Sequence, residues 1–189
     1  KLVLATGSKP IRLDVPGMDL PGVLTFRDLA DVASIEKAAE THRKAVVIGG
    51  GLLGLEAAYG LVKAGLQVSV VHLMDRLMER QLDARASVLL RETVEAKGIA
   101  VLLDAETAAI KGVHHAETVA LEDGREIAAD LVVVAAGIRA NAGLGQGAGL
   151  EIGRGIIVDD NLQTSRANII AIGECAEHRG ICYGLVEPA

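Results

Sequence analysis

Residues Lys44–Leu73 read KAVVIGGGLLGLEAAYGLVKAGLQVSVVHL, and the remainder of the chain can be understood around them. Ala45–Ile48 is a short apolar run rich in β-branched side chains, which is typical of a strand buried on both faces. Leu55–Ala64 has helical spacing and good helix formers, and Gly65 ends that helix. Gln67–His72 has the composition of a second strand. The stretch therefore predicts one βαβ unit.

Three glycines follow the first strand in the pattern G-x-G-x-x-G, at Gly49, Gly51 and Gly54. Between a strand and a helix, this pattern is the fingerprint of a dinucleotide-binding turn. We expect Gly49 to allow the tight turn, Gly51 to let a pyrophosphate approach the backbone, and Gly54 to let helix and strand pack closely. The N–H groups of Leu52 and Leu53 would face the phosphates. The pattern favours NAD(H) or NADP(H) as a ligand over a glycine-rich turn without one.

Composition narrows the possible classes of function. Half of the 189 residues are hydrophobic, with one Phe and no Trp, so the core should consist of small aliphatic side chains that suit a parallel sheet covered by helices. A net charge of −6 argues against nucleic acid as a partner, because that requires clustered basic residues. No apolar run long enough for a membrane span, no signal peptide and no disulfide framework is indicated. We expect a cytoplasmic protein that does not associate with membranes.

The two ends of the chain are abrupt. The sequence opens directly on a strand-like run at Lys1–Ala5 and stops after GLVEPA at residues 184–189. We expect a piece of a longer polypeptide, whose remaining parts would be its partners.

Outside the βαβ unit, the first half of the chain alternates between connections and helices. Residues 11–27 contain Pro16, Pro21 and two glycines and are predicted to be an extended linker. A surface helix is predicted within Arg27–Arg43. Met74–Gln81 is predicted to be a loop, and Asp83–Lys97 a helix with Asp83 as N-cap. The apolar stripe of that second helix is expected to comprise Ala86, Leu89, Leu90, Thr93 and Val94.

The second half of the chain is predicted to consist mainly of short strands. Ile99–Leu103 and Asp130–Ala135 read as buried strands, and residues 106–129 read as an antiparallel meander laid against the sheet, with a hairpin turn at residues 122–125. Gly143–Gly149 is glycine-rich and is predicted to be a flexible connection. Gly155–Asp159 and Ile169–Ile172 are two further predicted strands.

Three short segments together resemble the two-dinucleotide-domain flavoproteins of the pyridine nucleotide-disulfide oxidoreductase type. These are ATG at Ala5–Gly7, AAG at Ala135–Gly137 and TSRANIIAIGE at Thr164–Glu174, with Glu174 where most members have Asp. The resemblance implies that the ATG-type turns mark where the chain leaves and re-enters an FAD domain, and that the Gly173–Glu174 segment reaches the flavin. It adds Ala136, Gly137, Gly173 and Glu174 to the candidate cofactor-binding residues.

Further details are similar to the large subunit of NAD(P)H-dependent nitrite reductases, namely GGGLLGLE at Gly49–Glu56, LMDRLMERQLD at Leu73–Asp83 and GECAEHRGICYG at Gly173–Gly184. The resemblance implies hydride transfer from NAD(P)H to FAD. It also implies siroheme and an iron–sulfur cluster, but only in domains that are absent from this chain. Hydride transfer requires stacking and orientation and no protein acid or base, so no catalytic residue and no metal ligand is proposed.

The resemblance predicts an α/β fold in which a Rossmann-like parallel sheet with an antiparallel meander is inserted between remnants of an FAD-binding domain. The predicted parts are an FAD-domain remnant and linker at residues 1–23, an NAD(P)H-binding domain at residues 24–140, and a second FAD-domain remnant at residues 141–189. Three alternatives stay open: the same fold serving another electron acceptor such as ferredoxin, rubredoxin or oxygen, a non-catalytic NAD(H)-sensing module, and a pure interaction fragment, which would require the phosphate site to be blocked.

Four side chains are candidates for contacts that recognise the nucleotide, namely those of Glu56, His72, Arg76 and Arg80. The resemblance implies that Glu56 lies beside the nicotinamide carboxamide. His72 ends the second strand, where a dinucleotide site usually has Asp or Glu for the ribose 2′-hydroxyl of NAD, or a nearby Arg for the 2′-phosphate of NADP. His72 could donate to either group, and Arg76 and Arg80 follow in the loop. We expect NADH to be the preferred nucleotide, because no pair of basic residues directly follows the strand.

Overall fold

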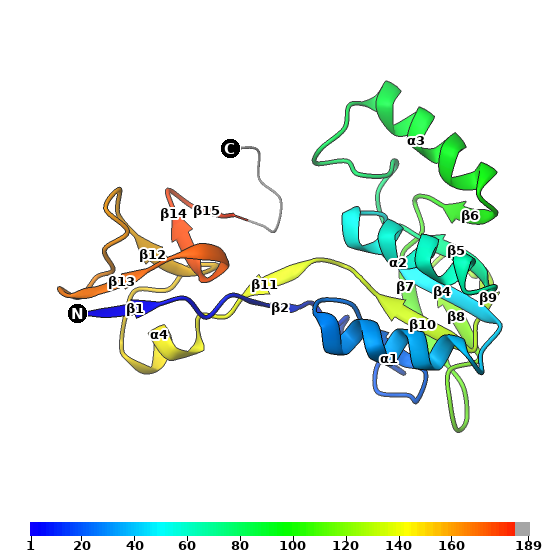
Figure 1. Cartoon of the computed structure of the whole chain (residues 1–189), viewed down its shortest axis with the longest axis horizontal. Coiled ribbons are helices and arrows are strands. Elements are labelled where there is room, and N and C mark those ends of the chain that lie inside the picture. Colours follow the sequence, from blue (N-terminus) through cyan, green and yellow to red (C-terminus); the bar gives the residue numbers. More distant parts are fainter. Residues whose placement is uncertain (184–189) are drawn as a thin grey trace. The chain divides into compact units, whose positions relative to one another are not determined.

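The computed structural model describes residues 1–183, which form two compact units (Figure 1). The sheet unit is Ile11–Gly137. The split unit consists of Lys1–Pro10 together with the described residues from Ile138 onward, so the sheet unit is an insertion within its sequence. The sheet unit thus begins at Ile11, earlier than the predicted start of the NAD(P)H-binding domain at residue 24.

The sheet unit is built on a five-stranded, all-parallel sheet. Its strand order is β3 (Val23–Thr25), β10 (Leu131–Val134), β4 (Lys44–Ile48), β5 (Gln67–Val71) and β6 (Ile99–Leu102). The strand β4 is the first of the βαβ unit, and the chain returns to opposite sides of it as β5 and β10. Such a reversal of direction is a topological switch point, where parallel sheets bind ligands beyond the carboxyl ends of their strands.

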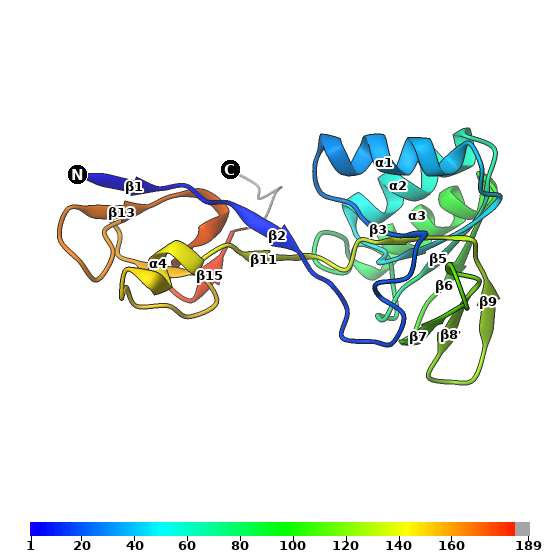
Figure 2. The same cartoon turned by 90° about the horizontal axis from the view of Figure 1, so that it is seen from below.

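Side chains of the parallel strands alternate between two hydrophobic cores. Ala45 and Val47 face the layer of helices, whereas Val46 and Ile48 face the meander. The helices are α1 (Leu29–Ala39), α2 (Leu52–Lys63) and α3 (Ala84–Ala96), and the meander is β7 (Thr107–Lys111), β8 (Thr118–Leu121) and β9 (Glu126–Ala128). Figure 2 shows α1 and α2 on one side of the sheet and β7–β9 on the other. The fold class predicted from the sequence is confirmed.

Two predictions for the sheet unit are wrong. Residues 11–27 are more than a linker, because they contain the edge strand β3, which pairs with β10. In α3, the predicted stripe is only partly correct: Val94 is buried and Leu90 packs against the core, but Leu89 and Thr93 are exposed. Ser87 was not predicted to be buried, and its hydroxyl donates to the Leu77 carbonyl oxygen at 2.8 Å, which satisfies this polar group on the inner face.

The split unit consists of short paired strands around a small core of its own. Leu4, Ile156, Ala171 and Cys175 are among its buried residues. The pairs are β1 (Leu2–Leu4) with β13 (Ile169–Ala171), β2 (Ser8–Pro10) with β11 (Ile138–Ala140), and β14 (Ala176–His178) with both β12 (Ile156–Val158) and β15 (Ile181–Cys182). Residues Gly173–Cys175 form a single 3₁₀ turn, η1.

The predicted flexible connection at Gly143–Gly149 contains a short helix, α4 (Gly143–Gly147), which corrects that prediction. Gly145 is buried, and a Cβ atom at this position would lie 3.0 Å from the side chain of Ile156. The absence of side chains therefore lets the helix pack closely on the core. In the part of the chain that the structure describes, no helix combines the length and the apolar character needed to cross a membrane.

Candidate dinucleotide-binding site

The turn after β4 requires glycine at two positions for reasons internal to the protein. Gly49 has φ = +126°, and a Cβ atom there would overlap the backbone of Ala135. A Cβ atom at Gly54 would overlap the carbonyl oxygen of Gly49. The first glycine thus permits the turn and the second permits the close approach of α2 to that turn. Both would be required even in the absence of a ligand.

Gly51 differs from its neighbours because nothing in the fold requires a glycine there. Its φ of −84° suits any residue, and an added Cβ atom would have no heavy atom within 4 Å. The backbone at this position is bare and faces open space. A missing side chain that the fold does not demand is what a close-approaching ligand would need.

The N-terminus of α2 also lacks the usual protein partners. Gly51 is the N-cap and provides no side-chain acceptor, and the first turn contains no acidic residue. Within residues 1–183, the N–H groups of Gly51, Leu52 and Leu53 donate to no protein acceptor. Those donors, together with the positive end of the helix dipole, form a site that favours an anion such as a phosphate.

The end of the neighbouring strand β10 lies against the same turn. The Ala135 N–H donates to the Ile48 carbonyl oxygen at 2.8 Å, which extends the ladder to the start of the glycine turn. Ala136 packs against the core on the meander side, and Gly137 has φ = +106°. The predicted residues Ala136 and Gly137 thus follow the carboxyl end of β10, at the switch point.

Glu56 lies one turn into α2 from the glycine turn. Glu56 is exposed, and within the described residues its side chain makes no hydrogen bond or ion pair. A carboxylate in that condition can accept a hydrogen bond from a ligand amide without giving up an existing contact.

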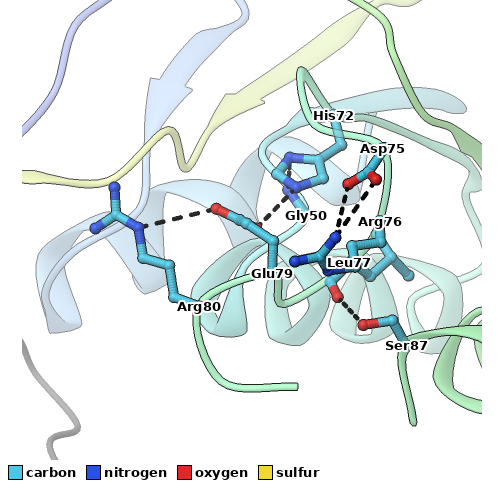
Figure 3. A network of polar contacts seen from close by, with 8 residues as sticks. All are labelled: Gly50, His72, Asp75, Arg76, Leu77, Glu79, Arg80 and Ser87. Atoms are coloured by element: carbon cyan, nitrogen blue, oxygen red, sulfur yellow. Dashed lines mark hydrogen bonds and ion pairs between the residues drawn. The ribbon is translucent and has the colours of Figure 1, made fainter. Parts of the chain in front are cut away.

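His72 packs closely against Gly50 of the glycine turn (Figure 3). It is 8% exposed, and its Nδ1 accepts a hydrogen bond from the Gly50 N–H at 3.0 Å. Because Nδ1 is the acceptor, the proton of the neutral ring is on Nε2, which donates to Glu79 Oε2 at 3.1 Å. Both ring nitrogens are engaged within the protein. The role of His72 at the ribose stays a prediction, and a direct contact there would require one of these hydrogen bonds to be exchanged.

The loop between β5 and α3 is tied to the glycine turn. The Met78 N–H donates to the Gly50 carbonyl oxygen at 3.1 Å, and the Leu77 side chain is fully buried. A Cβ atom at Gly50 would lie 2.7 Å from both His72 and Leu77, so the turn and the loop are closely packed. Gly50 and Glu79 were not predicted as site residues, because no periodicity or motif in the sequence connects them.

The two predicted loop arginines have different surroundings. Arg76 Nη1 lies 3.3 Å from its neighbour Asp75, and its buried Nε has no hydrogen-bond partner within the described part of the chain. Arg80 is 82% exposed, and its Nε lies 3.9 Å from Glu79 Oε1. The side chain of Arg80 is therefore largely exposed to solvent, whereas that of Arg76 lies against the loop.

The remaining predicted residues belong to the split unit. Gly173 has φ = +72° and begins η1, and the adjacent Glu174 Oε2 accepts a hydrogen bond from the Ser8 hydroxyl at 3.0 Å. Cys175 and Cys182 are both free thiols. Burial, followed by the charge of Glu177, raises the pKa of Cys182, which keeps this thiol protonated and weakly nucleophilic near neutral pH.

Comparison with known proteins agrees with this geometry. The model of the pyridine nucleotide-disulphide oxidoreductase family matches residues 1–186. Nitrite reductase [NAD(P)H] of Bacillus subtilis is 53% identical over 188 residues, which are all of this chain and 23% of that protein. Rubredoxin-NAD(+) reductase of Pseudomonas putida is 37% identical over 97% of this chain and 48% of its own length. The chain thus spans less than half the length of these relatives.

Solved structures give the same result. The ferredoxin reductase for the CYP199A2 system of Rhodopseudomonas palustris superposes with a TM-score of 0.90 and 37% identity over 93% of this chain and 44% of that one. The water-forming NADH oxidase of Lactobacillus brevis bound to NADH has a TM-score of 0.86 and 26% identity over 93% of this chain and 39% of that one. The chain therefore belongs to the pyridine nucleotide-disulphide oxidoreductase family.

Proposed function

We propose that this chain is the nicotinamide-binding part of a flavoprotein reductase that passes hydride from NAD(P)H to FAD. The observation that carries the proposal is the bare N-terminus of α2 at the switch point of the parallel sheet. Gly51 has no side chain although the fold would accept one, and the N–H groups of the first turn have no protein acceptor within residues 1–183. A pyrophosphate supplies the charge and the acceptors that this arrangement lacks.

The proposal gives each part of the sheet unit a role. Gly49, Gly51 and Gly54 shape the turn, and Leu52 and Leu53 donate their backbone N–H groups to the pyrophosphate. Glu56 accepts a hydrogen bond from the nicotinamide carboxamide, which orients the ring. Ala136 and Gly137 border the site at the end of β10. These residues bind and orient the nucleotide, and none of them needs to exchange a proton.

The split unit is proposed to be a part of the FAD-binding domain. Gly173 has nothing within 4 Å of an added Cβ atom, and Glu174 offers a carboxylate that is held by Ser8. A bare backbone position followed by a hydrogen-bonding carboxylate fits a polyhydroxylated chain such as the ribityl group of FAD. When bound, FAD supplies a two-electron acceptor for the hydride.

In the parent polypeptide, the electrons would serve nitrite reduction. This step rests on the names of relatives, among them nitrite reductase [NAD(P)H] of Bacillus subtilis. Siroheme and an iron–sulfur cluster would belong to regions outside this chain. A second candidate is electron transfer to a small carrier protein, because Rubredoxin-NAD(+) reductase of Pseudomonas putida is also similar over almost the whole chain.

A nucleotide titration tests the proposal. We expect the chain to bind NADH or NADPH, and Gly51→Val to weaken that binding at least about tenfold, which corresponds to roughly 1.4 kcal/mol. Gly60→Val is the matched control, because Gly60 is also in α2 and also has nothing within 4 Å of an added Cβ atom. Calorimetry that gives the same affinity for both variants, with unchanged circular dichroism, would refute the pyrophosphate site.

Retention of flavin is a separate test. We expect the purified chain to lose FAD on dialysis, because the second glycine-rich fingerprint that an FAD domain needs for its pyrophosphate is not among its motifs. Absorbance at the flavin band before and after dialysis is the measurement. A stoichiometric yellow flavin that survives dialysis would contradict this expectation while leaving the nicotinamide site untouched.

A further inference from the structure

We propose that Glu79, positioned by His72, selects NADH over NADPH. The inference rests on the proposed function, since it assigns a role within the same nucleotide site. The two nucleotides differ only at the adenosine ribose, where NADH has a neutral 2′-hydroxyl and NADPH has a charged 2′-phosphate. Glu79 is proposed to be the protein group that faces this position.

His72 and Glu79 are in direct contact. The ring of His72 connects the Gly50 N–H, 3.0 Å from Nδ1, to Glu79 Oε2, 3.1 Å from Nε2 (Figure 3). The side chains of His72 and Glu79 are 10% and 22% exposed. Because Nδ1 must accept from a backbone N–H, Nε2 is the donor, and the carboxylate of Glu79 is the group that it holds.

The backbone around Glu79 is fixed as well. Met78 donates its N–H to the Gly50 carbonyl oxygen, and the buried Leu77 receives a hydrogen bond from Ser87 at its carbonyl oxygen. The loop is thus attached to the glycine turn on one side and to α3 on the other. A carboxylate on such a loop is held in place before any ligand arrives, which avoids the entropy cost of ordering it on binding.

Dinucleotide sites that take NADH usually have an acidic residue for the adenosine ribose. Such sites place an acidic residue at the end of the second strand, where it accepts a hydrogen bond from the ribose 2′-hydroxyl. In this chain the strand-end residue is His72, whose two nitrogens are occupied. Glu79 brings a carboxylate to within 3.1 Å of that ring from seven residues further along the chain. The acid is therefore supplied by the loop instead of the strand.

Two arginines lie in the same loop as Glu79. Arg80 lies 3.9 Å from Glu79 Oε1 but is 82% exposed, and Arg76 is directed toward Asp75. An exposed arginine is screened by salt and loses side-chain entropy when it is held in one geometry. The side chain of Glu79 is only 22% exposed, and its carboxylate is already held by His72 before a ligand binds. Its repulsion of a 2′-phosphate should therefore outweigh the attraction by Arg80.

The test compares dissociation constants for NADH and NADPH in the full 189-residue chain at fixed salt. We expect the wild type to bind NADH at least tenfold more tightly than NADPH. Glu79→Gln should reduce this ratio at least fivefold, mainly by strengthening NADPH binding. The control is Glu95→Gln on α3, which removes the same charge from another carboxylate that is paired with an arginine, Arg91. That variant should keep the wild-type ratio.

His72→Asn tests the positioning role. Asparagine keeps an acceptor for the Gly50 N–H but is too short to reach Glu79, so the ratio should fall as it does in Glu79→Gln. A variant that weakens both nucleotides equally would show that His72 supports only the turn and would overturn its part in selection.

Two other outcomes overturn the proposal in distinguishable ways. A wild type that binds neither nucleotide refutes the proposed function and this inference with it. A wild type that binds NADH or NADPH but keeps its ratio in Glu79→Gln refutes this inference alone. A preference for NADPH that disappears in Arg80→Ala would assign the selection to the arginine.

Discussion

The helices α2 and α3 lie in the same unit, yet their first turns are built differently. α3 begins at an aspartate, Asp83, whose carboxylate accepts a hydrogen bond from the Ala86 N–H at 2.8 Å. α1 begins in the same way at Asp28, which accepts from two N–H groups. α2 begins at Gly51, which has no side chain to accept anything.

The difference in capping distinguishes first turns that stabilise the fold from a first turn that is available to a ligand. A helix of a folded protein gains stability when a side chain satisfies its first N–H groups. α1 and α3 have such a side-chain cap, and α2 has none. The backbone of Gly51 nevertheless has the extended conformation of an N-cap residue, with φ = −84° and ψ = −174°. The bare turn coincides with the switch point of the sheet. We therefore interpret the uncapped first turn of α2 as the place where the phosphates of the proposed nucleotide bind.

The largest effect expected from this comparison is on stability at Gly54. Gly54→Ala introduces a Cβ atom that overlaps the Gly49 carbonyl oxygen and should lower the free energy of unfolding by about 3 kcal/mol, the upper end of the usual cost of overpacking. Gly51→Ala makes the same chemical change in open space and should cost no more than about 1 kcal/mol, because its main expected cost is that alanine is a poorer N-cap than glycine. Urea unfolding measures both. Equal losses would mean that the two glycines serve the same purpose.

A smaller effect is expected from removing a cap. Asp83→Ala leaves the Ala86 N–H without its acceptor and should lower the free energy of unfolding by about 1 kcal/mol. Nucleotide affinity should not change, because Asp83 is not among the proposed site residues and the contact between Ser87 and Leu77 that attaches the Glu79 loop to α3 is left in place. Thermal unfolding and a titration on the same sample check this pair of expectations. A clear loss of nucleotide affinity would show that α3 is coupled to the site.

Much of the sheet unit could be predicted from the sequence, because its signals are local. The βαβ unit is encoded by β-branched runs, by helical spacing and by glycines, and Asp83 was predicted as a cap from its position before an apolar stripe. The hairpin turn at residues 122–125 likewise joins β8 to β9 as predicted.

The errors involve contacts that join distant residues. β3 is a strand because it pairs with β10, more than a hundred residues away, while its own sequence is short and follows Gly22 and Pro21. α4 forms in a glycine-rich segment because Gly145 packs against Ile156. The hydrogen bonds of His72 with Gly50 and Glu79 are not errors but contacts that the sequence did not indicate, because they depend on the path of a loop that no spacing rule describes.

The most direct measurement for the central claim is to give α2 the cap that α1 and α3 already have. Gly51→Asp should leave the free energy of unfolding unchanged or raise it by roughly a few tenths of a kcal/mol, because glycine is itself a tolerable N-cap. The same carboxylate would occupy the free N–H groups and repel a pyrophosphate.

NADH titration of Gly51→Asp should therefore show an affinity at least about tenfold lower than that of wild type, equivalent to roughly 1.4 kcal/mol. Gly60→Asp, which adds the same charge to an exposed position of the same helix, should bind NADH with nearly wild-type affinity. A folded Gly51→Asp variant that binds NADH as tightly as Gly60→Asp does would contradict the claim that the start of α2 is kept bare for a nucleotide.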